Sequence, residues 1–475
     1  GTDLSQAING TTTFALNADS TIEVRTRNTT GPGKAGLKVT SNGIATYANG
    51  TWDKAASYSA IQVNDNLNLT SDLTVCSCTV QSNKNLIIES DNTLVVLENI
   101  VVADGGQIIV ENNGSLVQVD DNATYTGNNT SFKMNRNTTP LFRLDYTYWS
   151  TPLNPISGYK LIDLSPNTLA TKYYKWSNAW VAVNRNTEVM VPGRGYIIRA
   201  PNNFPMESSG DQPQIDNVVF TGQPNNGMIT IPIDNSGDGW NLIGNPYPSA
   251  LDIEEFYRNP NNQSILDGTI YLWTHNTEIA LSGTSYNYSK SDYASYNMTG
   301  GTGTTGGNVS TPEGKVASGQ SFFIKGLASG NAEFNNSMRV RQGGLNNQFF
   351  KPAPTEVVEN WQTTGKHRVW LNLTSTQNDF NQTLIGYIEN ATNQLDWGYD
   401  GDVFSGGIVS IYSIANNKPL TIQGRALPFS NLDEVPLGYK TTLTGTLTIS
   451  IDHLDGLLEG QNIYLKDNVL NLVHN

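Results

Sequence analysis

Short runs of β-branched and aliphatic residues alternate with polar turns along most of the chain. Gly, Asn, Asp or Pro interrupts these runs every eight to twelve residues or so, a spacing that is typical of strands. Only residues 252–257 suggest a helical turn. The pattern therefore predicts an all-β protein.

Between residues 45 and 135 the apolar runs become shorter and closer together. Triplets such as Leu86–Ile88, Leu94–Val96 and Ile108–Val110 recur, with polar turns between them. This spacing is too close for a hairpin sandwich, but it suits the rungs of a coil in which each rung buries its face on the next. We expect residues 45–135 to form a short β-solenoid, and residues 1–44 to end a preceding module or cap the coil.

Residues 140–345 contain one motif twice. The first copy reads YWSTPLNP, KYYKWSNAW and VPGRGYIIR, and the second reads GWNLIGNPYP, TIYLWTHN and VASGQSFFIK. Trp149 and Trp240 are each followed, five residues later, by Asn-Pro, and Gly193 aligns with Gly319 in the last strand. We therefore expect a duplicated β module. The second copy also holds a Gly-, Ser- and Thr-rich tract, residues 282–310, which predicts a mobile surface loop.

Strand signals resume after the Pro-containing residues 351–354. Alternation is clearest over residues 446–451, where Leu447, Ile449 and Ile451 share one face of the expected strand. We expect residues 365–475 to form a C-terminal β-sandwich.

Charge and composition exclude some classes of partner. The net charge is −14, and an acidic chain is repelled by phosphate backbones and anionic lipid, so we expect no nucleic-acid partner. No apolar run is long enough to span a membrane. Cys76 and Cys78 lie on one face of an expected strand, which favours two buried thiols over a strained disulfide, a pair that reacts with a partner, or a metal site.

The chain offers little catalytic chemistry. It has no HExxH, GxSxG or P-loop motif, and the string Gly301-x-Gly303-x-x-Gly306 has no strand before it and no helix after it. The neighbouring carboxylates Glu254–Glu255 and Asp433–Glu434 point in different directions, so neither pair forms the acid and base of a glycosidase. We expect no enzymatic activity.

Two acidic loops are candidates for calcium. Alternating oxygen side chains next to a Gly can wrap a hard cation, although an ordinary polar turn explains the same residues. The candidate ligands are Asp234, Ser236 and Asp238 in the first loop and Asp396, Asp400 and Asp402 in the second.

Aromatic residues of the duplicated module permit two interpretations. They could form a sugar-stacking platform, but most of them recur at matching points of the two copies, which favours core packing. The residues are Trp149, Trp176, Trp180, Trp240 and Trp273, with Tyr173, Tyr174 and Tyr271.

Several of these segments resemble one family. CSCTV, NLIIESDNTLVV, LDYTYWSTPL, VPGRGYIIRAP and GWNLIGNPYPSALD resemble large surface proteins of gliding Bacteroidetes that are exported by the type IX secretion system. The segment HRVWLNLTSTQNDFNQTLIGYIENAT is similar to the module that precedes the sorting domain in that group. The likeness covers roughly residues 45–475.

The resemblance implies an adhesin-like protein of the cell surface or extracellular space, and it carries over no catalytic residue. Its implied partners are outer-membrane components of the type IX secretion system and surfaces or glycans. Calcium, which the two acidic loops suggest, is the one candidate cofactor. It also implies a strand pair and a sorting domain beyond Asn475, so we expect a fragment that lacks them. The alternatives are a carbohydrate-active enzyme or carbohydrate-binding module, and a structural stalk.

Overall fold

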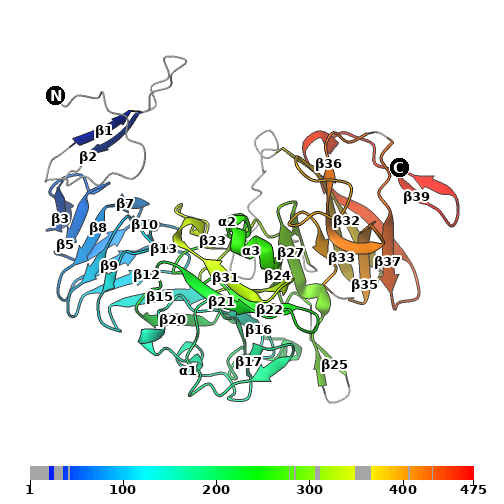
Figure 1. Cartoon of the computed structure of the whole chain (residues 1–475). Helices are drawn as coiled ribbons and strands as arrows, with labels where there is room; N and C mark the ends of the chain where they lie inside the picture. The colour runs from blue at the N-terminus through cyan, green and yellow to red at the C-terminus, as the bar shows by residue number, and fades with distance from the viewer. Residues whose placement is uncertain are drawn as a thin grey trace.

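Strands dominate the structure, which confirms the all-β prediction (Figure 1). The computed structural model describes residues 21–25, 36–40, 43–277, 279–282, 285–304, 311–347, 365–404, 407–430 and 432–475. Thr21–Arg25 (β1) and Gly36–Thr40 (β2) pair antiparallel. Most of the remaining residues of the expected cap, 1–44, lie outside the described part of the chain. None of the helices that the structure describes is long and apolar enough to cross a membrane.

Residues 44–137 wind through three sheets, and we call this segment the coil. Its strands are β3 (Ile44–Ala48), β4 (Thr51–Trp52), β5 (Ala60–Val63), β6 (Leu67–Leu69), β7 (Leu73–Val75), β8 (Ser77–Val80), β9 (Asn85–Ile88), β10 (Thr93–Val96), β11 (Ile100–Val102), β12 (Gln107–Val110), β13 (Ser115–Gln118), β14 (Tyr125–Thr126) and β15 (Phe132–Asn137). The chain visits the three sheets in the same order on each pass, and strands of successive passes pair in parallel.

Buried side chains stack in columns through the coil. Cys78 pairs with Ile100 and Leu86 pairs with Ile108, so each of these passes takes 22 residues. All four side chains are 1% exposed or less. Burying an aliphatic side chain stabilises a fold by about 1.5 to 3 kcal/mol, so each pass is held mainly by the next.

The duplicated region begins with β15 and consists of two repeats. Repeat 1 (residues 132–222) adds β16 (Tyr146–Trp149), η1 (Pro155–Ser157), α1 (Leu161–Leu164), β17 (Tyr173–Trp176), β18 (Trp180–Ala182), β19 (Tyr196–Arg199), η2 (Glu207–Ser209) and β20 (Asn217–Gly222). Repeat 2 (residues 229–334) contains β21 (Ile229–Ile233), β22 (Trp240–Gly244), β23 (Leu251–Asp252), α2 (Ile253–Arg258), α3 (Pro260–Ile265), β24 (Leu266–Trp273), β25 (Ala280–Ser282), β26 (Ser285–Asn287), η3 (Lys290–Asp292), β27 (Tyr293–Asn297), β28 (Gly300–Thr302), β29 (Lys315–Val316), β30 (Ser321–Gly326) and β31 (Gly330–Phe334), and η4 (Asn336–Met338) follows it.

The two repeats share one strand order. The inner sheet of repeat 1 is β16-β19-β17-β18, and that of repeat 2 is β22-β30-β24-β27 with β28 added at its edge. The first and last strands of each repeat form an antiparallel outer pair, β15 with β20 and β21 with β31. β15 also pairs with β12 of the coil, so one strand belongs to both regions.

Isolated β-bridges also join the two repeats. Trp149 of repeat 1 bridges to Gln320 of repeat 2, and Ile243 of repeat 2 bridges to Arg194 of repeat 1. The turn glycines Gly193 and Gly319 have φ values of 78° and 77°. That left-handed region favours glycine, and the matching angles agree with the predicted alignment of these two residues.

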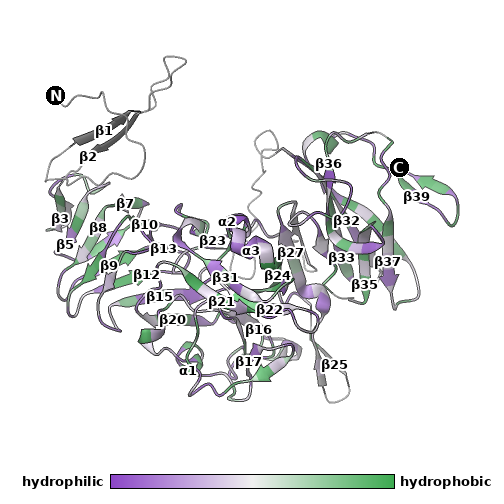
Figure 2. Ribbon diagram, in the orientation of Figure 1, coloured by the Kyte–Doolittle hydropathy of each residue, from purple (hydrophilic) through white to green (hydrophobic). Residues whose placement is uncertain are grey.

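The C-terminal residues form one mixed sheet, which we call the C-terminal sheet. Its order is β37-β35-β36-β33-β32-β38, with β34 also on β36. The elements are β32 (Lys366–Ser375), β33 (Phe380–Ile388), β34 (Gly401–Asp402), β35 (Val409–Ala415), β36 (Lys418–Ala426), β37 (Leu437–Thr441), β38 (Leu447–Leu454) and η5 (Gly456–Leu458). A separate hairpin, β39 (Leu465–Asp467) with β40 (Leu472–His474), extends away from this sheet and is partly hydrophobic (Figure 2). Leu472 and Val473 in it are exposed.

The tract 282–310 differs from its prediction. Most of residues 293–304 are buried, with only Tyr293 and Met298 partly exposed. They form β27, β28 and the residues next to these strands. Trp370 Nε1 of the C-terminal sheet donates to the Gly301 carbonyl (2.8 Å), and Gly303 N–H donates to Gln382 (2.8 Å). The prediction of a mobile loop was wrong here, because small residues let a second sheet approach and bond to the backbone.

Two local predictions also need correction. Residues 253–258 form the expected helix, capped by Asp252, but α1 and α3 are helices that the pattern did not predict. Cys76 lies at a corner between β7 and β8, whereas Cys78 is buried within β8, so the two thiols do not share one strand face. Both cysteines are free thiols.

Candidate functional site

Two tryptophans hold the repeats together by reciprocal hydrogen bonds. Trp176 of repeat 1 donates its indole N–H to the carbonyl of Trp240 (2.7 Å), the first residue of the inner sheet of repeat 2. Trp273 of repeat 2 donates to the carbonyl of Tyr146 (3.0 Å), the first residue of the inner sheet of repeat 1. Trp176 and Trp273 therefore act as equivalent parts of the scaffold.

The strand registers correct the alignment of the other tryptophans. Tyr146 pairs with Arg199, and Trp240 pairs with Lys325, so Tyr146 is the counterpart of Trp240. The predicted match of Trp149 with Trp240 is wrong by three residues. An odd shift moves a side chain to the other face of a strand, and Trp149 indeed packs on Phe220 while Trp240 packs on Tyr271.

Most candidate residues of the sugar platform lie in the seam between the inner sheets. Tyr148 stacks on Trp273 with the ring centroids 5.8 Å apart and the planes 10° apart, and Trp240 contacts Phe404 at 4.4 Å. Trp149 is 2% exposed and Trp273 is 5% exposed. Trp180, at 38%, lies on the rim of this cluster. These rings therefore form an aromatic core that is accessible to solvent at Trp180.

The residue two positions after Trp176 and the residue two positions after Trp273 both have a positive φ. Asn178 follows Trp176 with φ 56°, and His275 follows Trp273 with φ 43°. Each reaches the loop that precedes the inner sheet of the other repeat. Asn178 Nδ2 donates to Asp234 (3.1 Å) and to Ser236 (2.8 Å). This contact places the first predicted calcium loop at one end of the seam.

Oxygen atoms of that loop already accept hydrogen bonds. Asp234 accepts from Ser236 N–H (2.8 Å), and the hydrogen bonds from Ser236 and Asn178 hold the pKa of Asp234 below its ordinary value. Asp238 lies in the same exposed turn. The structure thus brings Asp234 and Ser236 together through Asn178, a residue that the sequence pattern did not single out.

The second predicted loop packs between repeat 2 and the C-terminal sheet. Asp396 accepts from Thr392, Asp400 accepts from Gly424 N–H (2.9 Å), and Asp402 forms ion pairs with Lys325 (3.2 Å) and Lys418. Burial raises the pKa of Asp400 to about 6. These carboxylates make different local contacts, and among the described residues no group of three or more His, Cys, Asp or Glu side chains is arranged to hold a metal ion.

The opposite end of the seam carries a buried group that the sequence analysis missed. His275 Nδ1 lies 3.8 Å from Asp145, and its Nε2 lies 2.9 Å from the Thr139 hydroxyl. Asp292 closes the turn nearby by accepting from the Thr277 hydroxyl (2.6 Å). We call Asp145, His275 and Asp292 the acidic corner.

Burial sets the protonation of the acidic corner. It raises the pKa of Asp145 to about 7, with further contributions from the negative charges of Glu207 and Asp292. It also raises the pKa of Asp292 to about 6. No motif marks these residues, since Asp145 precedes β16 while His275 and Asp292 lie at the two ends of the segment between β24 and β27. The local feature that marks the corner is the positive φ two residues after Trp273, which matches that of Asn178 after Trp176. A backbone angle of this kind cannot be recognised in the sequence.

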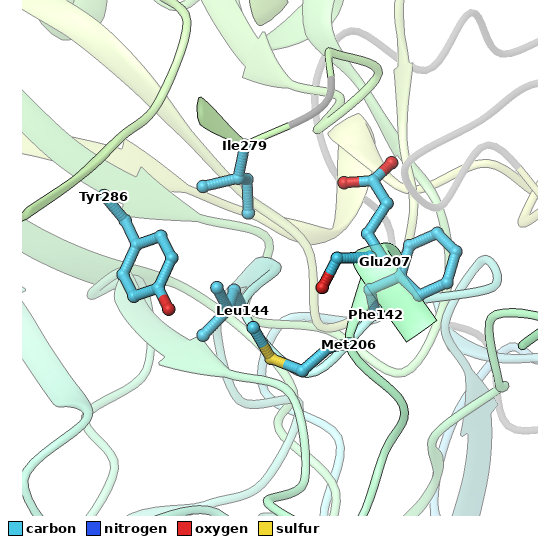
Figure 3. A pocket seen from close by; sticks show the side chains of 7 residues that line it. Phe142, Leu144, Met206, Glu207, Ile279 and Tyr286 are labelled. Carbon is cyan, nitrogen blue, oxygen red and sulfur yellow. The ribbon is translucent and has the colours of Figure 1, made fainter. Parts of the chain in front are cut away.

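A pocket of about 210 Å³ opens beside the acidic corner. Figure 3 shows Leu144 and Met206 between Tyr286 on one side and Phe142 with Glu207 on the other. The lining residues are Phe142, Leu144, Met206, Glu207, Ser208, Ile279 and Tyr286.

Two insertions, one from each repeat, supply most of the residues that line the pocket. Repeat 1 has 17 residues (200–216) between its last two strands, where repeat 2 has 3 (327–329). Repeat 2 has 19 residues (274–292) between β24 and β27, where repeat 1 has 3 (177–179) between β17 and β18. The first insertion supplies Met206 and Glu207, and the second supplies Ile279 and Tyr286. The repeats therefore differ most where this pocket lies.

Comparison with known proteins identifies a family but no characterised relative. Neither curated proteins nor solved structures gave a match to the chain. A family model described as "Domain of unknown function (DUF8693)" matches residues 50–475, which include the coil from β4 onwards, both repeats and the C-terminal sheet. The chain therefore belongs to the DUF8693 family.

Proposed function

We propose that this chain is part of a secreted, adhesin-like protein of the cell surface, and that it binds surfaces, glycans or secretion partners without enzymatic turnover. The observation that carries the proposal is that the longest insertion of each repeat relative to the other contributes to one pocket. Shared features of the repeats serve packing, whereas loops added to a rigid scaffold are where proteins commonly place recognition.

The architecture suits such a role. In this proposal the three sheets of the coil are the sides of a β-solenoid. The C-terminal sheet folds onto itself as a β-sandwich. Buried residues of β32, β33 and β35, including Leu371, Ile385 and Ile411, share one core, as expected for a sheet folded onto itself. The sequence resemblance to type IX secretion cargo supports export, with outer-membrane secretion components as partners.

Binding assays on surfaces and glycans test the proposal. The labelled chain should bind at least one glycan or coated surface, and a double substitution of Ile279→Ser with Tyr286→Ser should weaken that binding about tenfold or more. A control pair, Val181→Ser with Met228→Ser, removes exposed apolar side chains elsewhere and should leave binding unchanged. Equal binding by both variants would show that the pocket is not the binding site. No binding to any surface or glycan contradicts the proposal and favours a structural stalk.

One observation favours the alternative of a carbohydrate-active enzyme. Asp145 and Asp292 are buried carboxyls with raised pKa values next to a pocket, and such carboxyls can donate protons near neutral pH. A screen of polysaccharides for release of reducing ends tests this. Turnover that is lost in Asp145→Asn would replace the binding proposal by a hydrolase.

A further inference from the structure

The pocket combines an apolar wall with a negative charge. Leu144, Met206 and Ile279 contribute aliphatic surface, Phe142 and Tyr286 contribute aromatic rings, and Glu207 contributes a carboxylate. Arg143 lies between two lining residues in the sequence but does not itself line the pocket. The volume of about 210 Å³ is below the about 300 to 1,000 Å³ of a typical ligand pocket, so the pocket suits a small group.

Electrostatics around the pocket favour a cation. The negative charges of Glu207 and Asp292 both act to raise the pKa of Asp145, which shows that three carboxyls influence one region. His275, which lies beside Asp145, is the basic residue of the acidic corner. A positive group at the pocket would interact favourably with the Glu207 carboxylate, and with Asp145 and Asp292 wherever these are ionised, whereas an anion would be repelled.

We infer that this pocket receives the basic side chain of a partner polypeptide, lysine in the first instance, with its alkyl stem against Leu144, Met206 and Ile279 and its ammonium at Glu207. A lysine side chain has an aliphatic stem that gains from apolar contact and a charged end that needs an acceptor. The pocket supplies both features. The inference rests on the proposed binding function and gives it a ligand class.

Methyl NMR of the whole chain can test the inference. The protein has six methionines, so a chain labelled at the methionine methyl groups gives few signals, and Met206→Leu identifies the one in the pocket. The probe is N-acetyl-lysine N-methylamide, and the matched neutral probe is N-acetyl-norleucine N-methylamide. The lysine probe should shift the Met206 methyl signal and saturate, while the norleucine probe should bind at least tenfold more weakly.

Variants assign the effect to the carboxylate. Glu207→Gln keeps the shape of the side chain and should weaken lysine binding about tenfold, while Asp211→Asn removes an exposed charge outside the pocket and should have no effect. The other five methionine signals show whether each variant is folded. Equal binding of the two probes, or full binding by Glu207→Gln, overturns the inference.

Two further outcomes separate this inference from the proposed function. Glucosamine that shifts the Met206 signal more strongly than the lysine probe would assign the pocket to an amino sugar and overturn the inference. If the lysine probe produces no shift while the chain still binds glycans or surfaces, the inference fails and the proposed function stands.

Discussion

The two ends of the seam between the repeats share one geometry but differ in chemistry. At one end Asn178 bonds to Asp234 in an exposed turn, and the pKa of Asp234 is lowered. At the other end His275 lies against Asp145 in a buried corner, and the pKa of Asp145 is raised. The same backbone turn therefore produces a stable polar turn where water is present, and a titratable group where two insertions exclude water.

Removal of an indole that donates a hydrogen bond from one repeat to the other should give the largest effect. Trp273→Ala should lower the free energy of unfolding by about 3 to 5 kcal/mol, because it removes a buried ring and leaves the Tyr146 carbonyl without its donor. Trp176→Ala should cost less, since Trp176 is only partly buried. Urea denaturation measures both, and an equal or reversed order would contradict the asymmetry between the two ends.

Neutralising the buried carboxyl should stabilise the protein at high pH. Because the pKa of Asp145 is higher in the folded state than in the unfolded chain, stability is lost as pH rises from about 4 through 7. Asp145→Asn should therefore raise the free energy of unfolding at pH 8 by about 1 to 3 kcal/mol, with little change at pH 4.

Asp234→Asn is the matched control, and its effect should have the opposite sign. The pKa of Asp234 is lowered in the folded state, so its contribution is present above about pH 4 and lost in acid. The melting temperature should fall slightly at pH 7. Chemical denaturation and calorimetry across pH check both variants, and a fall in stability for Asp145→Asn at pH 8 would show that Asp145 is paired rather than destabilising.

The turn residues themselves can be exchanged. Ala tolerates positive φ poorly, so His275→Ala and Asn178→Ala should each destabilise the chain by about 1 kcal/mol, whereas His275→Asn should keep the turn. Thermal unfolding of the three variants measures the difference. A loss as large for His275→Asn as for His275→Ala would mean that contacts of the imidazole, and not the backbone angle, dominate.

Calcium should produce the smallest effect. Ion binding at the loop of Asp234, Ser236 and Asp238 must compete with existing hydrogen bonds, so we expect a Kd near 1 mM and a stabilisation of about 0.4 kcal/mol at 1 mM calcium. Calorimetry with calcium and with chelator tests this loop and the loop of Asp396, Asp400 and Asp402. An identical melting temperature in both solutions contradicts the calcium prediction.

The sequence predicted strands better than it predicted their partners. Triplets such as Leu86–Ile88 marked the strands of the coil, since apolar periodicity is a local signal. The shift of Trp149 against Trp240 could not be seen, because register depends on pairing with a strand about fifty to eighty residues away. The tract 293–304 looked disordered because its burial depends on the C-terminal sheet and not on its own side chains.

The candidate site was harder to predict than the fold. Asp145, His275 and Glu207 are distant in sequence, and each looks like an ordinary polar loop residue. The unequal lengths of the insertions were partly visible, since the sequence showed the longer second copy. Their meeting at one pocket follows only from the crossing of the two repeats.

The strand β15 has a mechanical consequence. It is bonded on one edge to β12 of the coil and on the other to β20 of repeat 1, so no flexible linker separates these regions. Tension applied between them would load both ladders of hydrogen bonds along their length, and many bonds would have to break together. A pulling force on this chain would therefore meet a stiff joint at this position instead of a hinge.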